Sequence, residues 1–197
     1  MTVVETPRGP AEVDWVLPAG RAKGLLVLGH GAGGSVDAPD LCAVRDAAQA
    51  VGFAVARVTQ PYRVAGRRAP PAASTLDEAW TTVVAALPGL TGVKRKLIVG
   101  GRSSGARVAC RTARALGAVG VLALAFPLHP PGRPEVTRAG ELDPTMPTLV
   151  INGDRDPFGV PEAGGAVEVV VLAGERHDLK RDPALVGAAA RAWLRAR

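Results

Sequence analysis

Short apolar runs alternate along this chain with segments whose apolar residues recur at the spacing of a helix. The apolar runs predict strands at 24–29, 53–62, 96–101, 119–128, 148–153 and 167–174. The helical spacing predicts helices at 41–52, 75–87, 104–116 and 182–196. Several predicted strands are apolar throughout and do not alternate with polar residues, which is typical of strands buried on both faces.

The order of these elements predicts an α/β fold. Strands and helices alternate after residue 24, which favours a mostly parallel central sheet with helices on both faces. Before it, two β-prone runs flank Arg8-Gly9-Pro10 and predict an N-terminal antiparallel hairpin. The length of 197 residues and the lack of internal repeats predict a single domain over 1–197.

Chemically versatile side chains gather in the loops that follow the predicted strands. These loops read HGAGG at 30–34, GRSSG at 101–105, FPLHPPG at 126–132, GDRDPFG at 153–159 and GERHD at 174–178. The carboxyl ends of parallel strands meet at one edge of a sheet, and folds of this class bind their ligands there. We therefore expect the functional site at this edge.

The segment 101–105, Gly-Arg-Ser-Ser-Gly, has the G-x-S-x-G pattern of a nucleophile elbow. It lies between a predicted strand and a predicted helix, as the pattern requires. The glycines matter because a side chain at either flanking position would clash with neighbouring elements. The helix start brings N–H groups and the positive end of the helix dipole beside the serine oxygen. The pattern predicts Ser103 as a nucleophile, and the competing interpretation is a small-residue turn that only lets two elements pack.

A nucleophilic serine requires a base, and the chain has three histidines. In hydrolases with this elbow the partners follow in the order serine, acid, histidine. His177 fits this order, whereas His30 precedes the serine and His129 precedes the acidic turn. That turn offers two acids. We predict that Asp156, which lies further into the turn, orients the histidine, with Asp154 as the alternative.

An acyl-transfer site also needs two N–H donors for the oxyanion. One donor is expected from Ser104, the residue after the nucleophile. The other is expected from the glycine loop at 30–34, where Ala32 is preferred to Gly33. His30, at the start of that loop, is predicted to form structural hydrogen bonds, although it could also contact substrate.

The formal charge of +6 comes mainly from arginines spread over the whole chain. No basic run with interleaved aromatic residues occurs, which argues against nucleic-acid binding. Five basic residues near the predicted site could contact a small ester that carries a negative charge: Arg67, Arg68, Arg102, His129 and Arg133. The alternative, which we favour for any single arginine, is an ion pair with a nearby acidic residue that holds a long loop in place.

Cysteine usage and the N-terminus predict a cytoplasmic protein. Cys42 and Cys110 form neither a disulfide framework nor a metal motif, and free thiols suit a reducing compartment. The N-terminus lacks the basic start and apolar core of a signal peptide. The longest apolar stretch is too short to span a bilayer, so no membrane partner is expected. The sequence leaves the oligomeric state open.

With these segments located, the chain resembles the α/β-hydrolases, specifically the compact dienelactone-hydrolase-like type. It is most similar to a family of small predicted hydrolases that includes the eukaryotic testis-expressed protein 30 and the hydrolase-like domain of a subunit of the non-specific-lethal chromatin complex. The segments that carry the resemblance are HGAGG at 30–34, RRAPP at 67–71, GGRSSGARVA at 100–109, FPLHPPGRPE at 126–135 and GDRDPFG at 153–159. The pair HPPG and GDRDPFG is more specific to this family than the elbow is.

The sequence departs from that family in two places. Ser104 and Ala106 stand where relatives usually have a methionine and a second glycine. The segment GERHD stands where a Gly-Asp-His type of turn is common. Neither departure removes a member of the predicted triad, but Ser104 adds a second hydroxyl near the site.

The resemblance implies an α/β-hydrolase fold and a triad of Ser103, Asp156 and His177. We expect a serine hydrolase that cleaves a small ester or thioester through an acyl-enzyme intermediate, without a metal or an organic cofactor. Because the family's substrates are poorly defined, a non-catalytic scaffold or binding protein with the same fold is the alternative. No insertion of the size of a lid domain precedes residue 148, so we expect a shallow, open site that suits small esters.

Overall fold

The computed structural model describes residues 1–94 and 96–197. Its strands are β1 (Thr2–Thr6), β2 (Gly9–Val16), β3 (Gly24–Gly29), β4 (Phe53–Thr59), β5 (Lys96–Arg102), β6 (Gly120–Leu124), β7 (Thr148–Gly153) and β8 (Val167–Leu172). Its helices are α1 (Pro39–Ala50), α2 (Pro61–Val64), α3 (Ala73–Thr91), α4 (Ser104–Thr112), α5 (Pro183–Arg195) and a short 3-10 helix, η1 (Ala139–Glu141).

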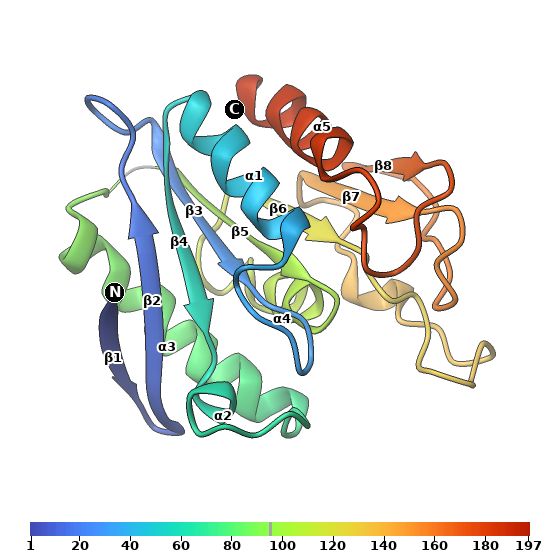
Figure 1. The fold of residues 1–197 in the computed structure, drawn as a ribbon, viewed down its shortest axis with the longest axis horizontal. Helices are drawn as coiled ribbons and strands as arrows, with labels where there is room; N and C mark the ends of the chain where they lie inside the picture. The colour runs from blue at the N-terminus through green and yellow to red at the C-terminus, as the bar shows by residue number, and fades with distance from the viewer. Residues whose placement is uncertain (95) are drawn as a thin grey trace.

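The strands of the described residues form one sheet in the order β1-β2-β4-β3-β5-β6-β7-β8 (Figure 1). β1 pairs antiparallel with β2, and β2 pairs antiparallel with β4. All pairs from β4 to β8 are parallel. β3 and β5 are neighbours, with Gly29 opposite Gly101. The loops that follow β3 and β5 therefore emerge side by side at the carboxyl edge of the sheet.

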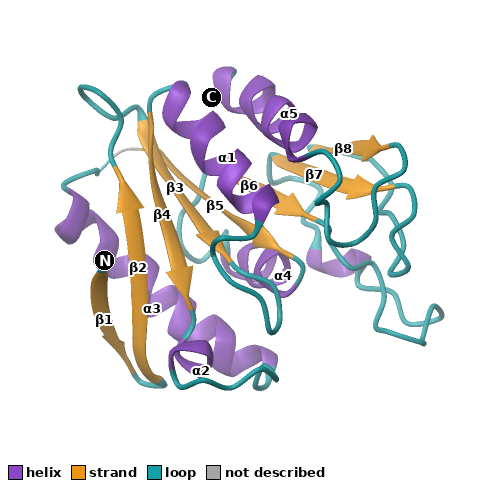
Figure 2. Ribbon diagram, viewed as in Figure 1, coloured by secondary structure: helices purple, strands orange, loops and turns teal. Residues whose placement is uncertain are grey.

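Helices cover both faces of the sheet (Figure 2). α1 and α5 pack against each other on one face, and α3 and α4 pack against each other on the other. Successive residues of β3 enter the two different cores. Val27 packs in the core that contains Trp80 of α3, and Leu28 packs in the core that contains Val186 of α5. Because successive side chains point to opposite faces of a sheet, a strand covered on both sides is apolar at every position.

The predicted α/β class, the N-terminal hairpin and the lack of a lid domain are confirmed. The connection from β6 to β7, residues 125–147, is described throughout and contains only η1 as regular structure. Within residues 1–94 and 96–197, no helix has the length and apolarity needed to cross a membrane.

Several predicted boundaries are wrong. The predicted strand 53–62 forms β4 only as far as Thr59, because α2 begins at Pro61. The predicted strand 119–128 forms β6 only as far as Leu124, because Ala125 takes a φ of 45° and turns the chain out of the extended conformation. The predicted helix 104–116 is regular only to Thr112, and turns carry the chain on to Gly117, whose φ is 65°. The segment 63–74, predicted as a loop, contains the end of α2 and the start of α3.

Gly105→Ala should destabilise the protein, because a Cβ at this position would lie 2.5 Å from the oxygen of Gly29 and 2.7 Å from that of His30. Both atoms belong to the backbone and cannot move aside cheaply. We expect the free energy of unfolding, measured by urea denaturation, to fall by about 2–3 kcal/mol.

Gly89→Ala is the matched control for this substitution. Gly89 lies within α3, and no neighbour beyond its own helix comes within 4 Å of the Cβ position. Alanine should stabilise the helix there by about 0.5–1 kcal/mol. Equal changes in the two variants would contradict the close-packing account of Gly105.

Candidate active site

Ser103 occupies a sharp turn between β5 and α4, with a φ of 52° and a ψ of −110°. A positive φ is strained for a residue with a side chain. The packing of neighbouring backbones enforces the turn. Gly101 and Gly105 both lie against the carbonyl oxygen of Gly29, and a Cβ at either position would come within 2.5 Å of it. The Ser103 N–H donates to the carbonyl of Leu124 at 2.9 Å, which joins the turn to β6.

A chain of hydrogen bonds joins Ser103, His177 and Asp156. Ser103 Oγ lies 2.9 Å from His177 Nε2, and Asp156 Oδ2 lies 2.8 Å from His177 Nδ1. If Nδ1–H donates to the carboxylate, Nε2 of the neutral ring is free to accept the serine proton. The three residues predicted from the order of motifs therefore lie in contact, although they come from three separate loops.

The Asp156 carboxylate is buried and held in place by donors from its own turn and from β7. Its Oδ1 accepts the N–H of Phe158 at 2.9 Å, and its Oδ2 lies 3.3 Å from Asn152 Nδ2. Asn152 is fully buried and accepts the N–H of Phe126 at 2.9 Å. Sequence analysis did not identify Asn152. The only feature of the sequence that could have indicated its role is its position at the end of a buried strand, just before the acidic turn. Its amide ties the strand ends of β6 and β7 to the carboxylate.

Asp154, the alternative acid, points elsewhere. It is exposed, and its Oδ1 accepts the N–H of Gly174 at 2.7 Å. Asp154 therefore braces the loop that leads to His177, whereas Asp156 contacts the imidazole itself.

The loop that carries His177 is held by two further contacts. The ring of Phe158 meets the imidazole edge-on, with the ring centroids 4.5 Å apart. Arg102 Nη2 donates to the main-chain oxygen of His177 at 3.1 Å. The sequence predicted that Arg102 could contact substrate, but its side chain extends to the loop of His177 and to Asp40 instead. Arg102 thus contacts the main chain of His177, whose ring contacts Ser103.

Asp40, in the first turn of α1, is the counter-ion of Arg102. Arg102 Nε lies 3.0 Å from Asp40 Oδ2, and the Asp40 side chain is completely buried. The Nε–H does not point at this oxygen well enough to form a hydrogen bond, so the contact is an ion pair only. Burial raises the pKa of Asp40 to about 6, and the charge of Arg102 opposes this rise. The sequence analysis did not identify Asp40 as part of the site.

A cavity of about 410 Å³ opens beside Ser103 and His177. Ala32 and Ser104, the two predicted oxyanion donors, also line it. Neither of their N–H groups has a main-chain acceptor in the part of the chain that the structure describes. Two main-chain donors are thus available on the wall of the cavity that contains the serine.

Two arginines that sequence analysis did not select line the same cavity. Arg107 lies in α4, one turn after the serine, and Arg138 lies just before η1. Arg107 pairs with Glu141, whereas Arg138 donates to the carbonyls of Pro127 and His129. Helical spacing from Ser103 could have indicated Arg107, but no pattern in the proline-rich loop distinguishes Arg138 from Arg133.

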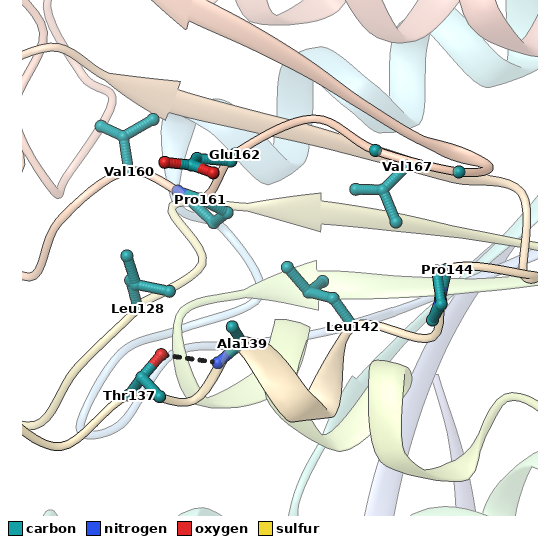
Figure 3. A pocket seen from close by; sticks show the side chains of 11 residues that line it. Leu128, Thr137, Ala139, Leu142, Pro144, Val160, Pro161, Glu162 and Val167 are labelled. Atoms are coloured by element: carbon teal, nitrogen blue, oxygen red, sulfur yellow. Dashed lines mark hydrogen bonds between the residues drawn. The ribbon is translucent and has the colours of Figure 1, made fainter.

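A larger cavity of about 590 Å³ is lined by a different set of residues (Figure 3). Leu128, Leu142 and Val167 line it together with Glu162, and neither Ser103 nor His177 reaches it. It offers an apolar space with one carboxylate but no nucleophile. The smaller cavity is therefore the candidate active site.

His30 is buried in the loop after β3 and does not line the 410 Å³ cavity. Its Nδ1 lies 2.8 Å from the oxygen of Gly31, and its Nε2 accepts the N–H of Gln60 at 3.1 Å. Burial lowers the pKa of His30, which favours the neutral ring that this arrangement requires. His30 thus joins the glycine loop to the end of β4.

The other predicted contacts also lie outside this cavity. Arg67 lines a separate cavity of about 220 Å³. Arg68 and Arg133 are exposed, and His129 is half-buried in the proline-rich loop. Gly33 follows Ala32 with a φ of 65° but does not line the cavity itself. The structure therefore does not bring these five residues to the space beside Ser103.

The described residues contain no cluster of three His, Cys, Asp or Glu side chains that could hold a metal ion. Cys42 and Cys110 are both free thiols. Burial raises the pKa of Cys110 to about 12, so its thiol stays protonated at neutral pH. This thiol is thus a poor nucleophile.

Known proteins with this fold include several hydrolases. Residues 22–186 match a family model described as an alpha/beta hydrolase domain. The structure of an alpha-beta serine hydrolase homologue from Coxiella burnetii has a TM-score of 0.81 at 17% identity, over 97% of this chain and 95% of that chain. A serine hydrolase without a lid from Xanthomonas campestris has a TM-score of 0.78 at 20% identity, over 99% and 93%. A dienelactone hydrolase from Anabaena variabilis has a TM-score of 0.73 at 21% identity, over 98% and 93%.

Identities this low show a shared fold and nothing finer. The search of curated proteins found no match to the chain.

Asp40→Asn should change how stability depends on pH. The folded protein retains a proton on Asp40 up to about pH 6, whereas the unfolded chain retains it only up to about pH 3.8. The contribution of Asp40 to stability is therefore largest at low pH and is lost as the pH rises through this window. The free energy of unfolding of the wild type minus that of the variant should fall by about 2 kcal/mol between pH 4 and pH 7. Urea denaturation at four pH values measures this difference, and parallel profiles would contradict the raised pKa.

Proposed function

The chain belongs to the family of alpha/beta hydrolase domains, and from this premise we propose that it is a serine hydrolase that cleaves a small carboxylic ester or thioester. The observation that carries the proposal is the unbroken chain of hydrogen bonds from Ser103 through His177 to the buried Asp156. A scaffold with this fold would not need a strained serine, a histidine and a carboxylate aligned beside a cavity.

In the proposed reaction, Ser103 Oγ attacks the carbonyl carbon of the ester while its proton passes to His177 Nε2. The carbonyl oxygen becomes an oxyanion that accepts hydrogen bonds from the N–H groups of Ala32 and Ser104. The intermediate then collapses. The alcohol or thiol leaves with the proton from the imidazolium, and the acyl group remains on Ser103 as an ester.

Deacylation repeats these steps with water. His177 takes a proton from the water, the hydroxide attacks the acyl carbon, and Ser103 regains the proton as the carboxylic acid departs. Asp156 stays ionised throughout, fixes the ring tautomer and stabilises the imidazolium. The hydrogen bond from Arg102 to the main chain of His177 keeps the ring positioned in both half-reactions.

The size and openness of the site favour small substrates. The cavity of about 410 Å³ has no lid over it, because only η1 interrupts the connection between β6 and β7. A long acyl chain would remain in water and contribute little to binding. Kinship with the small predicted hydrolases related to testis-expressed protein 30 is a prediction from the motifs. The alternative function is a non-catalytic scaffold or binding protein with the same fold, because the substrates of that family are poorly defined.

Ser103→Ala and His177→Ala should each abolish labelling by a fluorophosphonate probe, which reacts with activated serines. Each should also lower kcat/KM for a short-chain nitrophenyl ester by about 10⁴-fold or more. Ser104→Ala keeps the main-chain N–H and removes only the second hydroxyl, so labelling should persist. Labelling that survived Ser103→Ala would identify a different nucleophile, and a folded wild type that did not label at all would favour the scaffold.

Asp156→Asn and Asp154→Asn should separate the two acids. An amide at position 156 can donate to His177 and stabilise the wrong tautomer, so kcat/KM should fall by about 10⁴-fold. Asp154 is exposed, and its side chain has the N–H of Gly174 as its only hydrogen-bond partner among the described residues, so its variant should stay within about threefold of the wild type. Steady-state kinetics on both variants, with circular dichroism to establish folding, makes the comparison. Equal losses would contradict the assignment of Asp156.

A further inference from the structure

The candidate active cavity presents two guanidinium groups, and only one of them is neutralised. Arg107 Nε and Nη2 lie 2.8 Å and 2.5 Å from the two carboxylate oxygens of Glu141. This two-point contact pairs the guanidinium of Arg107 with a carboxylate through Nε and Nη2. Arg107 therefore forms part of the wall without a free charge.

Arg138 has no such partner. No carboxylate of the described residues lies within ion-pair distance of it, and its hydrogen bonds come from Nη1 alone, which donates to the carbonyls of His129 at 3.2 Å and Pro127 at 3.4 Å. Its Nε and Nη2 have no acceptor in the described part of the chain. These two N–H groups form the edge of a guanidinium that matches a carboxylate with two parallel hydrogen bonds.

Several charged side chains lie near Arg138. Arg111 shares Glu141 with Arg107 and also pairs with Asp77, so these two guanidinium groups are balanced by two carboxylates and Arg138 is left without a counter-charge among the described residues. Partial burial and the charge of Arg107 lower the pKa of Arg138, against the opposing effect of Glu141. An anion in the cavity would relieve this repulsion.

The side chain is also held in position before any ligand arrives. The main-chain N–H of Arg138 donates to the carbonyl of Leu128 at 2.7 Å, which fixes the backbone at this position. In the side chain, Nη1 donates to two carbonyls of the same loop. A donor edge that is already fixed loses little conformational entropy when it binds.

We propose that Arg138 is the specificity-determining residue of the cavity and binds a carboxylate group of the substrate, so that the preferred ester is anionic. The proposal rests on the proposed hydrolase function and names its substrate class: small esters with a free carboxylate, such as monoesters of short dicarboxylic acids. Arg67, Arg68 and Arg133 do not line the cavity.

The test compares two esters that differ in charge and by one methyl group. The probes are 4-nitrophenyl hydrogen glutarate, which carries a carboxylate, and its neutral methyl ester at the far carboxyl group. We expect the wild type to have the higher kcat/KM for the anionic probe. Arg138→Gln should lower the anionic-to-neutral ratio of kcat/KM by about 10–100-fold, which is the usual range for a lost charge-assisted hydrogen bond. Arg138→Lys keeps the charge but not the two-point geometry and should retain part of the ratio.

Arg191→Gln is the control for net charge. Arg191 is exposed on α5 and makes no hydrogen bond or ion pair with a described residue. The variant should keep the wild-type ratio. A second pair, 4-carboxyphenyl acetate and its methyl ester, places the carboxylate on the alcohol side. The pair whose ratio falls in Arg138→Gln identifies the half of the ester that Arg138 binds.

The outcomes separate the substrate class from the hydrolase function. If the wild type labels with the neutral fluorophosphonate probe but shows no preference for either anionic ester, the proposal is wrong and the hydrolase function stands. An equal loss on charged and neutral probes in Arg138→Gln would mean that the residue only supports its loop. Absence of both labelling and hydrolysis would overturn the substrate proposal together with the function on which it rests.

Discussion

The position of the candidate nucleophile depends on how closely three stretches of backbone approach one another. Gly29 at the end of β3 meets Gly101 and Gly105 on either side of the serine turn, with no room for a Cβ between them. This contact presses the start of α4 against β3 and leaves Ser103 with its positive φ. It also places the loop after β3, with Ala32, beside the first N–H groups of the helix. One packing constraint thus positions both the serine and the donors proposed for the oxyanion.

The histidine is positioned by buried charge instead. Asp156 holds its ring nitrogen, and Arg102 holds its main-chain oxygen from the other side, with Asp40 behind it. Burying a carboxylate costs free energy unless its partners compensate, and the raised pKa of Asp40 shows that its compensation is incomplete. Such incompletely compensated groups concentrate where a protein needs one fixed geometry more than it needs stability. The site therefore combines a strained turn with a costly ion pair, and the sheet between two apolar cores supplies the stability that both require.

Sequence patterns predicted the features of this site that are local and missed those that are not. The alternation of apolar runs and helical periods was enough for the sheet and its order of elements. The elbow, the acidic turn and the last histidine could be found because each follows a predicted strand and the order of motifs links them. Asn152 and Asp40 were missed because their roles depend on partners that only the folded chain brings near, Phe126 and Arg102 respectively. The sequence patterns also did not predict where the backbone becomes irregular. One example is the positive φ of Ala125, which ends β6.

The number of arginines near the cavity does not determine which ligands it attracts. Each guanidinium charge is neutralised only where a carboxylate lies against it. Arg102 directly precedes Ser103 in sequence, yet its guanidinium forms an ion pair with Asp40 and donates through Nη2 to the main-chain oxygen of His177. Arg107 lines the cavity, yet Glu141 pairs with its guanidinium through two hydrogen bonds. Arg138 is less conspicuous in the sequence than either, but main-chain carbonyls hold it without cancelling its charge. A carbonyl can orient a guanidinium while leaving its charge uncompensated, whereas a carboxylate orients it and neutralises it. This difference, more than the net charge of +6, makes the cavity suited to an anion.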